Sequence, residues 1–184
     1  MRIGLLGGSF NPPHSGHLNL SLQIRKKYNL NRIIWVVTPQ NPLKNPNIYK
    51  PFKQRFQLAQ ELTDQYRFIE VSDIDQKLNN YKTINTVRYF NKKFTNDDLF
   101  WIMGADSMID FHKWDFFKEI FKEINIIIGD REDYIHQAMR SKTALFFNES
   151  FREYDENIKF NDQKFWFFET IKKDHNSSTK LRKC

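Results

Sequence analysis

The first twenty residues of the chain, MRIGLLGGSFNPPHSGHLNL (1–20), decide how the fold begins. Residues 2–7 form a short apolar run that ends in glycine, which predicts a buried strand. Pro12 and Pro13 then interrupt regular structure, and a helix is predicted from about Gly16 to Lys27. A buried strand, a tight turn and a helix in this order are typical of the first unit of an α/β fold.

Strand and helix continue to alternate along the chain. Helices are predicted near 16–27, 52–62, 83–90 and 114–121, and strands at 2–7, 32–38, 67–71, 98–104, 125–129, 143–148 and 164–169. Parallel strands need crossover connections, which are usually helices. We therefore predict a single domain over 1–184 with an α/β, doubly wound, Rossmann-like fold, a mainly parallel central sheet and helices on both faces.

Composition narrows the class of protein. The formal net charge of +7 favours anionic partners such as nucleic acid, phosphorylated metabolites or acidic membrane surfaces. The single cysteine, Cys184, leaves no disulfide within the chain. The first residues do not resemble a signal peptide, and no apolar run approaches the roughly 18 residues of a membrane span. We expect a cytoplasmic protein without a membrane partner, and no pattern predicts its oligomeric state.

The segment after the first strand has the features of an anion site. Ligands of doubly wound sheets bind at the carboxyl ends of the strands. We expect Gly7 and Gly8 to allow close backbone approach and a positive φ, and Ser9 and Phe10 to present backbone N–H groups. Exposed amides beside a helix N-terminus bind anions, most often phosphate.

Two histidines follow in the same segment. His14 and His17 are three residues apart, so they share a face once the helix has begun, and Gly16 leaves room for a ligand. Alternatives are a histidine that caps or packs the helix start, or a zinc ligand, which would need further ligands. Neither a P-loop nor a dinucleotide-binding glycine pattern is present. His14 and His17 follow the first strand, at the end of the sheet where ligands bind, and this position favours phosphate binding.

Five motifs carry a resemblance to a known superfamily. GGSFNPPHSGHL (7–18) resembles the (H/T)xGH signature of the nucleotidyltransferases that move adenylyl or cytidylyl groups, and SSTKLR (177–182) resembles their SSTxxR motif. PQNPLK (39–44), YKTINT (81–86) and GADSMIDFHKW (104–114) resemble the bacterial nicotinate-nucleotide adenylyltransferases. The resemblance covers almost the whole chain. It implies transfer of AMP from ATP to nicotinate mononucleotide, giving deamido-NAD and pyrophosphate.

The resemblance also implies roles for individual residues. Catalysis would fall to His14, His17, Lys44 and Arg182, with His17 on the ATP phosphates in the transition state. Ser178 and Thr179 would cap a helix and donate to the β- and γ-phosphates while Arg182 clamps them. Mg²⁺ would enter with ATP, held by water and phosphate oxygens. The implied ATP-binding residues are Gly7, Gly8, Ser9, Phe10, His14, His17, Asp106, Ser178, Thr179 and Arg182.

The implied acceptor site involves a second set of residues. Trp114 would stack on the nicotinate ring, Asp106 would accept hydrogen bonds from a ribose, and Thr86 with neighbouring backbone amides would receive the nicotinate carboxylate. Each has a plainer alternative: a core tryptophan, a buried aspartate that caps the next turn, and for Lys44 a solvated loop lysine. The implied substrate-binding residues are Ser9, Phe10, Lys44, Thr83, Thr86 and Trp114.

The chain departs from the family pattern at three places. Leu43 stands where a histidine is common, Asn176 stands where an isoleucine is common, and the sequence stops two residues after Arg182. We therefore expect a lower affinity for ATP or a mobile C-terminus. Alternative functions are adenylyl transfer to nicotinamide mononucleotide or phosphopantetheine, a basic nucleic-acid-binding protein, and an inactive descendant used as a scaffold.

Overall fold

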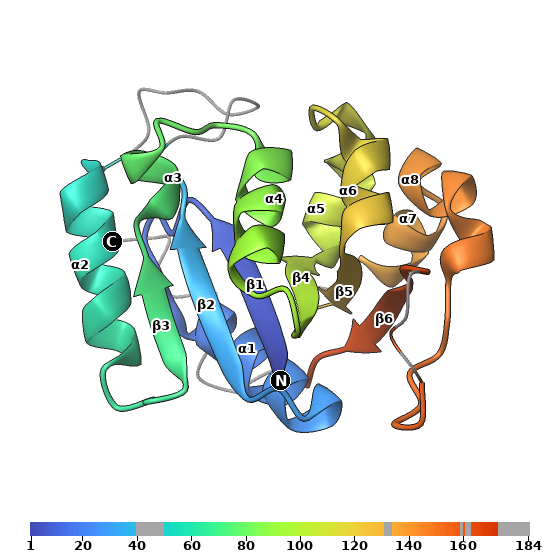
Figure 1. Cartoon of the computed structure of the whole chain (residues 1–184), viewed down its shortest axis with the longest axis horizontal. Coiled ribbons are helices and arrows are strands. Elements are labelled where there is room, and N and C mark those ends of the chain that lie inside the picture. Colours follow the sequence, from blue (N-terminus) through green and yellow to red (C-terminus); the bar gives the residue numbers. More distant parts are fainter. Residues whose placement is uncertain (40–49, 131–133, 159, 161–162, 173–184) are drawn as a thin grey trace.

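A parallel sheet forms the centre of the protein in the computed structural model, which describes residues 1–39, 50–130, 134–158, 160 and 163–172 (Figure 1). The strand order within these residues is β3-β2-β1-β4-β5-β6, and every neighbouring pair is parallel. The order reverses between β1 and β4, as in a doubly wound Rossmann-like fold, and this confirms the predicted fold class. The strands are β1 Arg2–Gly8, β2 Arg32–Val37, β3 Ile69–Ser72, β4 Asp98–Gly104, β5 Asn125–Asp130 and β6 Trp166–Thr170.

Helices cover both faces of the sheet. The first two, α1 and α2, pack on one face, and α4 to α6 lie in front of the opposite face in the view of Figure 1. Two short 3₁₀ turns, Phe111–Lys113 and Asn148–Ser150, join the later elements. The helices are α1 Ser15–Tyr28, α2 Phe52–Thr63, α3 Ile74–Lys77, α4 Thr83–Lys93, α5 Ala105–Asp110, α6 Phe117–Glu123, α7 Ile135–Met139 and α8 Lys142–Phe146.

The central strand β1 shows why the apolar runs in the sequence have no alternation. Ile3 and Leu5 are fully buried against the side of α4 to α8, whereas Leu6 is buried against the side of α1 and α2. A parallel strand covered by helices on both faces needs apolar side chains at successive positions. The run RIGLLG therefore contributes to two separate cores.

The glycines of β1 differ from the sequence-based expectation. The prediction of a positive φ at Gly7 and Gly8 is wrong, because no glycine among the described residues has a positive φ. Close approach does hold for Gly7, where a Cβ would lie 2.3 Å from Cη2 of Trp101. The turn after β1 instead uses Phe10, whose φ is 45°.

Of the two strands predicted late in the chain, one prediction is wrong. Residues 143–148 lie in α8 and the turn that follows it, not in a strand. Ser141 stands at the N-cap and its Oγ accepts a hydrogen bond from the Ala144 N–H at 3.1 Å, which starts a helix despite the aromatic run. The second late strand is confirmed as β6.

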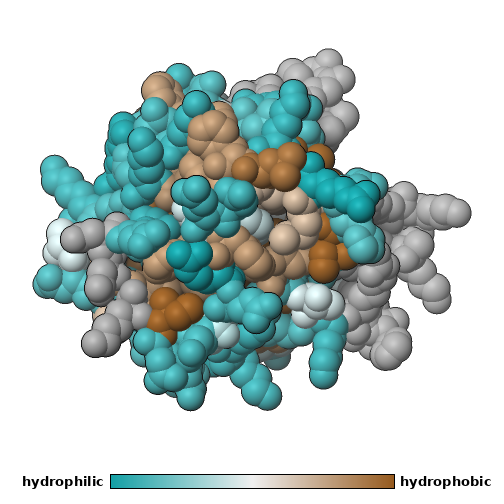
Figure 2. Space-filling model, turned by 90° about the vertical axis from the view of Figure 1, so that its right-hand side faces the viewer, coloured by the Kyte–Doolittle hydropathy of each residue, from teal (hydrophilic) through white to brown (hydrophobic). Residues whose placement is uncertain are grey.

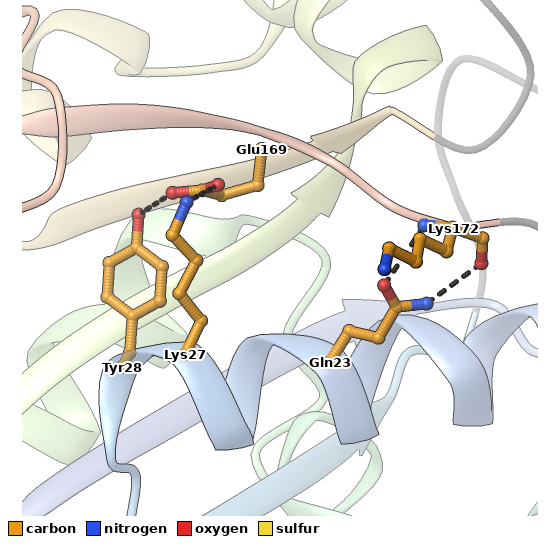
Figure 3. A network of polar contacts seen from close by, with 5 residues as sticks. All are labelled: Gln23, Lys27, Tyr28, Glu169 and Lys172. Atoms are coloured by element: carbon orange, nitrogen blue, oxygen red, sulfur yellow. Dashed lines mark hydrogen bonds and ion pairs between the residues drawn. The ribbon is translucent and has the colours of Figure 1, made fainter.

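Polar contacts join α1 to β6 and to the residue pair that follows it (Figure 3). Glu169 accepts hydrogen bonds from the Tyr28 hydroxyl at 2.7 Å and from Lys27. Burial, together with this hydrogen bond to Glu169, raises the pKa of Tyr28 above its usual 10.0. Gln23 pairs with the main chain of Lys172, so the first helix is tied to the last described residues of the chain.

The β6 end of the sheet carries an apolar surface. Its large exposed apolar side chains are Ile135 of α7 and Leu145 and Phe146 of α8. Figure 2 views this end and shows apolar atoms grouped among hydrophilic ones. None of the helices in the described ranges has the length and apolarity to cross a membrane.

Candidate active site

The two central strands end at the same edge of the sheet. Leu6 of β1 pairs with Ile102 of β4, so the loop that follows Gly8 and the helix that follows Gly104 both begin there. This is the position at which the strand order reverses, where open α/β sheets bind their ligands. The structure therefore places the His14 segment and Asp106 on the predicted ligand edge.

A reciprocal cap holds the two histidines at the start of α1. Nδ1 of His14 accepts a hydrogen bond from the Gly16 N–H at 3.1 Å, and Nδ1 of His17 accepts one from the His14 N–H at 3.3 Å. The ring centroids are 3.9 Å apart. The prediction that these rings share a face is confirmed, and so is the alternative that a histidine caps the helix.

The cap also fixes where each ring carries its proton. A nitrogen that accepts a hydrogen bond has no proton, so the neutral rings of His14 and His17 carry theirs on Nε2. Nε2 lies on the side of the imidazole remote from the capped backbone amides. Capping and phosphate binding are therefore compatible, because the first uses Nδ1 and the second would use the Nε2–H donor.

Phe10 belongs to the core rather than to an exposed loop. Its side chain is 1% exposed and its ring stacks on Trp35 with centroids 4.8 Å apart. The ring of His17 lies 4.9 Å away on the same aromatic cluster. Of the roles predicted for Phe10, the structure leaves only those of its backbone. One residue further on, the Asn11–Pro12 peptide bond is cis.

Arg55 is a residue of this region that sequence reasoning missed. Its side chain is 1% exposed, and its guanidinium donates hydrogen bonds to the Ser9 carbonyl, the Thr38 carbonyl at 2.9 Å and the Pro39 carbonyl at 2.6 Å. Nε donates to the Lys50 carbonyl at 3.0 Å. A signal was available, because Arg55 lies three residues after Phe52 on the inward, apolar face of α2.

Thr83 and Thr86 occupy different environments at the start of α4. Thr83 is the first helical residue and is partly exposed. Thr86 is fully buried, and its hydroxyl donates to Oδ1 of Asp75 at 2.6 Å and accepts from Nδ2 of Asn80 at 2.9 Å. The Thr86 side chain is therefore engaged by an internal network, and its predicted contact with substrate stays a prediction.

The carboxyl group of Asp75 is at the centre of that network. Burial raises its pKa above the usual 3.8, and the hydrogen bonds from Thr86 and Asn80 offset part of this rise. Asn80 also donates to the Lys82 carbonyl at 3.0 Å and accepts from the Lys82 N–H at 3.0 Å. The network fixes the backbone that leads into α4.

Asp106 and Trp114 follow β4 on the other side of the site. Asp106 is exposed in the first turn of α5, which differs from the alternative of a buried capping aspartate. Trp114 is half-buried, with its ring centroid 4.7 Å from that of Phe111. Both side chains have exposed surface at the edge where a ligand is expected, and their individual contacts with substrate stay predictions.

The remaining predicted residues lie outside the described part of the chain. They are Lys44, Ser178, Thr179 and Arg182, together with the departures at Leu43 and Asn176. The described residues contain no group of three or more His, Cys, Asp or Glu side chains that could hold a metal ion. A hollow of about 520 Å³ beside Met1, Arg2 and Asp98 lies at the opposite edge of the sheet, away from the histidines.

Comparison with known proteins decides the family. The family model described as cytidylyltransferase-like matches residues 5–184. The chain belongs to this family. It is therefore a nucleotidyltransferase, as the two end motifs indicated.

Relatives in this family support a narrower resemblance. A protein of Pelagibacter ubique named "Probable nicotinate-nucleotide adenylyltransferase" is 40% identical over 144 residues, which is 77% of this chain and 78% of the relative. A protein of Methylorubrum extorquens with the same name is 37% identical over 147 residues, which is 80% of this chain and 79% of the relative. The resemblance to nicotinate-nucleotide adenylyltransferases is therefore confirmed at the level of the family.

Solved structures show the same fold at lower identity. The Plasmodium falciparum nicotinic acid mononucleotide adenylyltransferase complexed with APC is 16% identical with a TM-score of 0.66, covering 92% of this chain and 74% of its own. The same enzyme complexed with NaAD is 17% identical with a TM-score of 0.63, covering 92% and 75%. These nucleotidyltransferases share the sheet and its helices with this chain.

Proposed function

We propose that this chain transfers the adenylyl group of ATP to nicotinate mononucleotide, giving deamido-NAD and pyrophosphate. The observation that carries the proposal is the pair of capped histidines, whose Nδ1 atoms are engaged by the helix backbone at the carboxyl end of β1. The names of the relatives from Pelagibacter ubique and Methylorubrum extorquens support the choice of substrate. So do the two ligands named for the Plasmodium falciparum enzyme, APC and NaAD.

The chemistry needs no protein nucleophile. The attacking group is the 5′-phosphate of the mononucleotide, whose second pKa is about 6, so it is largely dianionic at neutral pH. One of its oxygens forms a bond to the α-phosphorus of ATP while the bond from that phosphorus to the β-bridging oxygen breaks, and pyrophosphate leaves. The protein must align two anions and stabilise the negative charge that develops.

The histidines suit this task as hydrogen-bond donors. We assign Nε2–H of His17 to a phosphate oxygen that gains charge in the transition state, with His14 beside it. Because the cap holds both rings before substrate arrives, little reorganisation is required during the reaction. Lys44, Ser178, Thr179 and Arg182 are proposed to complete the phosphate contacts from segments further along the chain.

The acceptor side of the site is proposed to lie between α4 and the segment after β4. Thr83 begins α4, and the first backbone N–H groups of a helix lack intrahelical partners, so they can receive a carboxylate. The partly buried ring of Trp114 is proposed to stack on nicotinate, and the exposed Asp106 to accept a hydrogen bond from a ribose hydroxyl. A carboxylate forms stronger charge-assisted bonds than an amide, which favours nicotinate over nicotinamide.

Magnesium is proposed to arrive as part of the substrate, MgATP. Histidine nitrogens are poor ligands for Mg²⁺, which prefers oxygen and retains several waters. The ion would therefore be bound mainly through the phosphate oxygens. We further propose a cytoplasmic location, which the sequence supports through its single cysteine, and small-molecule nucleotides as the partners.

Pyrophosphate release tests the substrate assignment. The full chain is assayed with ATP and, separately, with nicotinate mononucleotide, nicotinamide mononucleotide or phosphopantetheine. We expect the highest kcat/KM with nicotinate mononucleotide, and a preference for either other acceptor would reject the assignment. A gel shift with nucleic acid that weakens steeply with salt, without pyrophosphate release, would instead favour the nucleic-acid-binding alternative.

A further inference from the structure

We infer that Arg55 is a positioning residue that holds the Ser9–Phe10 peptide with its N–H turned toward the bound phosphates. The inference deepens the proposed function and depends on it for the identity of the ligand. The Arg55 side chain is a cation that is only 1% exposed, and it lies beneath the loop after β1. Arg55 donates hydrogen bonds to four backbone carbonyls, those of Ser9, Thr38, Pro39 and Lys50.

The contact of Arg55 with the Ser9 carbonyl indicates which way the amide N–H of the same peptide points. In a trans peptide the C=O and the N–H of the next residue point in opposite directions. The Ser9–Phe10 peptide is trans, since the cis bond found in the described chain is Asn11–Pro12. The Ser9 carbonyl faces the guanidinium, so the Phe10 N–H points away from it.

The other carbonyls that Arg55 binds show why the Phe10 N–H is the donor that this arrangement orients. Thr38 and Lys50 each precede a proline, Pro39 and Pro51, so no N–H stands opposite these two carbonyls. Within the described residues, Phe10 alone therefore offers an amide N–H opposed to a carbonyl that Arg55 binds. The arrangement directs one backbone donor outward, in the part of the loop next to His17, whose ring lies 4.9 Å from that of Phe10.

The backbone at Phe10 needs such support. A positive φ is uncommon for a residue with a side chain, and it persists where the surroundings impose it. The ring of Phe10 is stacked on Trp35 with an interplanar angle of 14°, and Arg55 holds the carbonyl on its N-terminal side. Held from both sides, the amide is oriented before a phosphate binds, which is the condition for an efficient oxyanion donor.

Arg55 also links two loops that the ligand would contact together. Its hydrogen bonds join Ser9, after β1, to Thr38 and Pro39, after β2. A guanidinium is permanently charged and has five donors in a planar fork, whereas a lysine has a single ammonium group. Lysine would keep the charge but could not hold the carbonyls of both loops in the same geometry.

The test compares Arg55→Lys and Arg55→Gln with a matched control, Arg88→Gln. Arg88 is an exposed arginine of α4 that pairs with Glu123 and takes no part in the site. Each variant is checked by circular dichroism and thermal unfolding, and kcat and KM for ATP and nicotinate mononucleotide are measured well below the unfolding temperature. We expect a 10- to 100-fold loss of kcat in folded Arg55→Lys, on the order of losing one oxyanion donor, and no change in Arg88→Gln.

Folded Arg55 variants that keep the wild-type kcat would overturn the inference. A second measurement uses the unaltered chain and does not depend on how well the variants fold. Phenylalanine amides are labelled with ¹⁵N, the Phe10 signal is identified by its absence in Phe10→Leu, and inorganic pyrophosphate is added. We expect a large shift of the Phe10 amide signal, and a position unchanged at saturating pyrophosphate would reject the inference.

The two experiments also separate this inference from the proposed function. A wild-type chain that turns over nicotinate mononucleotide while folded Arg55→Lys is equally active removes only the role of Arg55. A wild-type chain that releases no pyrophosphate with any acceptor removes the proposed reaction. In that case a Phe10 amide signal that still responds to pyrophosphate, and that loses this response in folded Arg55→Lys, supports Arg55 as the organiser of an anion site.

Discussion

His17 accepts a hydrogen bond from the backbone N–H of His14 through Nδ1, with the two atoms 3.3 Å apart. The same imidazole therefore completes the cap of α1 and presents Nε2 as a donor. Stability and the proposed catalysis depend on opposite nitrogens of one ring. This separation makes it possible to remove the two contributions independently.

We predict that His17→Gln retains stability and loses activity, whereas His17→Ala loses both. A glutamine at this position of a capping box can still accept from the backbone N–H, but it lacks the imidazole. The expected loss of kcat is on the order of 10²-fold or more in both variants. Only His17→Ala should lose about 1 kcal/mol of unfolding free energy, measured in urea. Full activity in His17→Gln would contradict the phosphate role.

Gly7 and Gly8 offer a matched pair of substitutions. A Cβ at Gly7 would lie 2.3 Å from both Cη2 and Cζ2 of Trp101, whereas at Gly8 the nearest atom would be Cε2 of Phe10 at 3.4 Å. The indole of Trp101 is buried and has little space to move. We expect Gly7→Ala to lose about 1–3 kcal/mol of unfolding free energy and Gly8→Ala clearly less. Equal losses in urea denaturation would show that Trp101 can move aside.

Gln23 should contribute to stability by holding the segment after β6 (Figure 3). Its Oε1 accepts from the Lys172 N–H at 3.0 Å, and its Nε2 donates to the Lys172 carbonyl at 2.8 Å. Gln23→Ala removes both bonds, together with the bond from Nε2 to Oδ1 of Asn19 at 2.8 Å within α1, and should lower the unfolding free energy by about 1–2 kcal/mol.

Two further variants identify the cause. Gln23→Glu keeps the acceptor for the Lys172 N–H but places a carboxylate oxygen against the Lys172 carbonyl, so we expect it to lose stability as well. Gln57→Ala, which removes a glutamine paired with Glu61 on the exposed surface of α2, should change the unfolding free energy by less than about 0.5 kcal/mol. A loss in Gln57→Ala as large as that in Gln23→Ala would argue against a specific clamp.

Asp75 should make the stability of the protein depend on pH. Its pKa is raised in the folded state by burial, so folding favours the protonated form. This contribution is fully present below the ordinary pKa of 3.8 and is lost as the pH rises through the higher pKa of the folded state. Asp75→Asn cannot ionise and retains an oxygen that can accept from Thr86 and Asn80.

The free energy of unfolding relative to wild type should therefore shift in favour of Asp75→Asn as the pH rises from 4 to 7. Urea titrations across this range measure the difference. Asp73→Asn, which alters a partly exposed ion pair with Lys77, serves as the control. A difference between Asp75→Asn and wild type that stays constant with pH would rule out the raised pKa as the cause.

Much of the fold was predictable because the signals were local. Continuous apolar runs identified β1, β2, β4 and β5, since strands covered on both faces need apolar residues at every position. Residues 143–148 misled for the same reason, because a short aromatic run suits a buried strand and a packed helix equally. The N-cap at Ser141 distinguishes the two, and its effect is visible only when the Ala144 N–H is seen to bond to it.

By itself the sequence determined the alternation of strands and helices from β1 to β5, the edge at which a ligand would bind and the histidine pair that marks it. These features depend on neighbouring residues and on the spacing of apolar side chains. Tertiary structure alone decided that Thr86 is buried against Asp75, that Phe10 adopts a positive φ and that Arg55 joins the loops after β1 and β2. Each of these depends on a contact between segments far apart in the chain, and only the packed fold brings those segments within hydrogen-bonding distance.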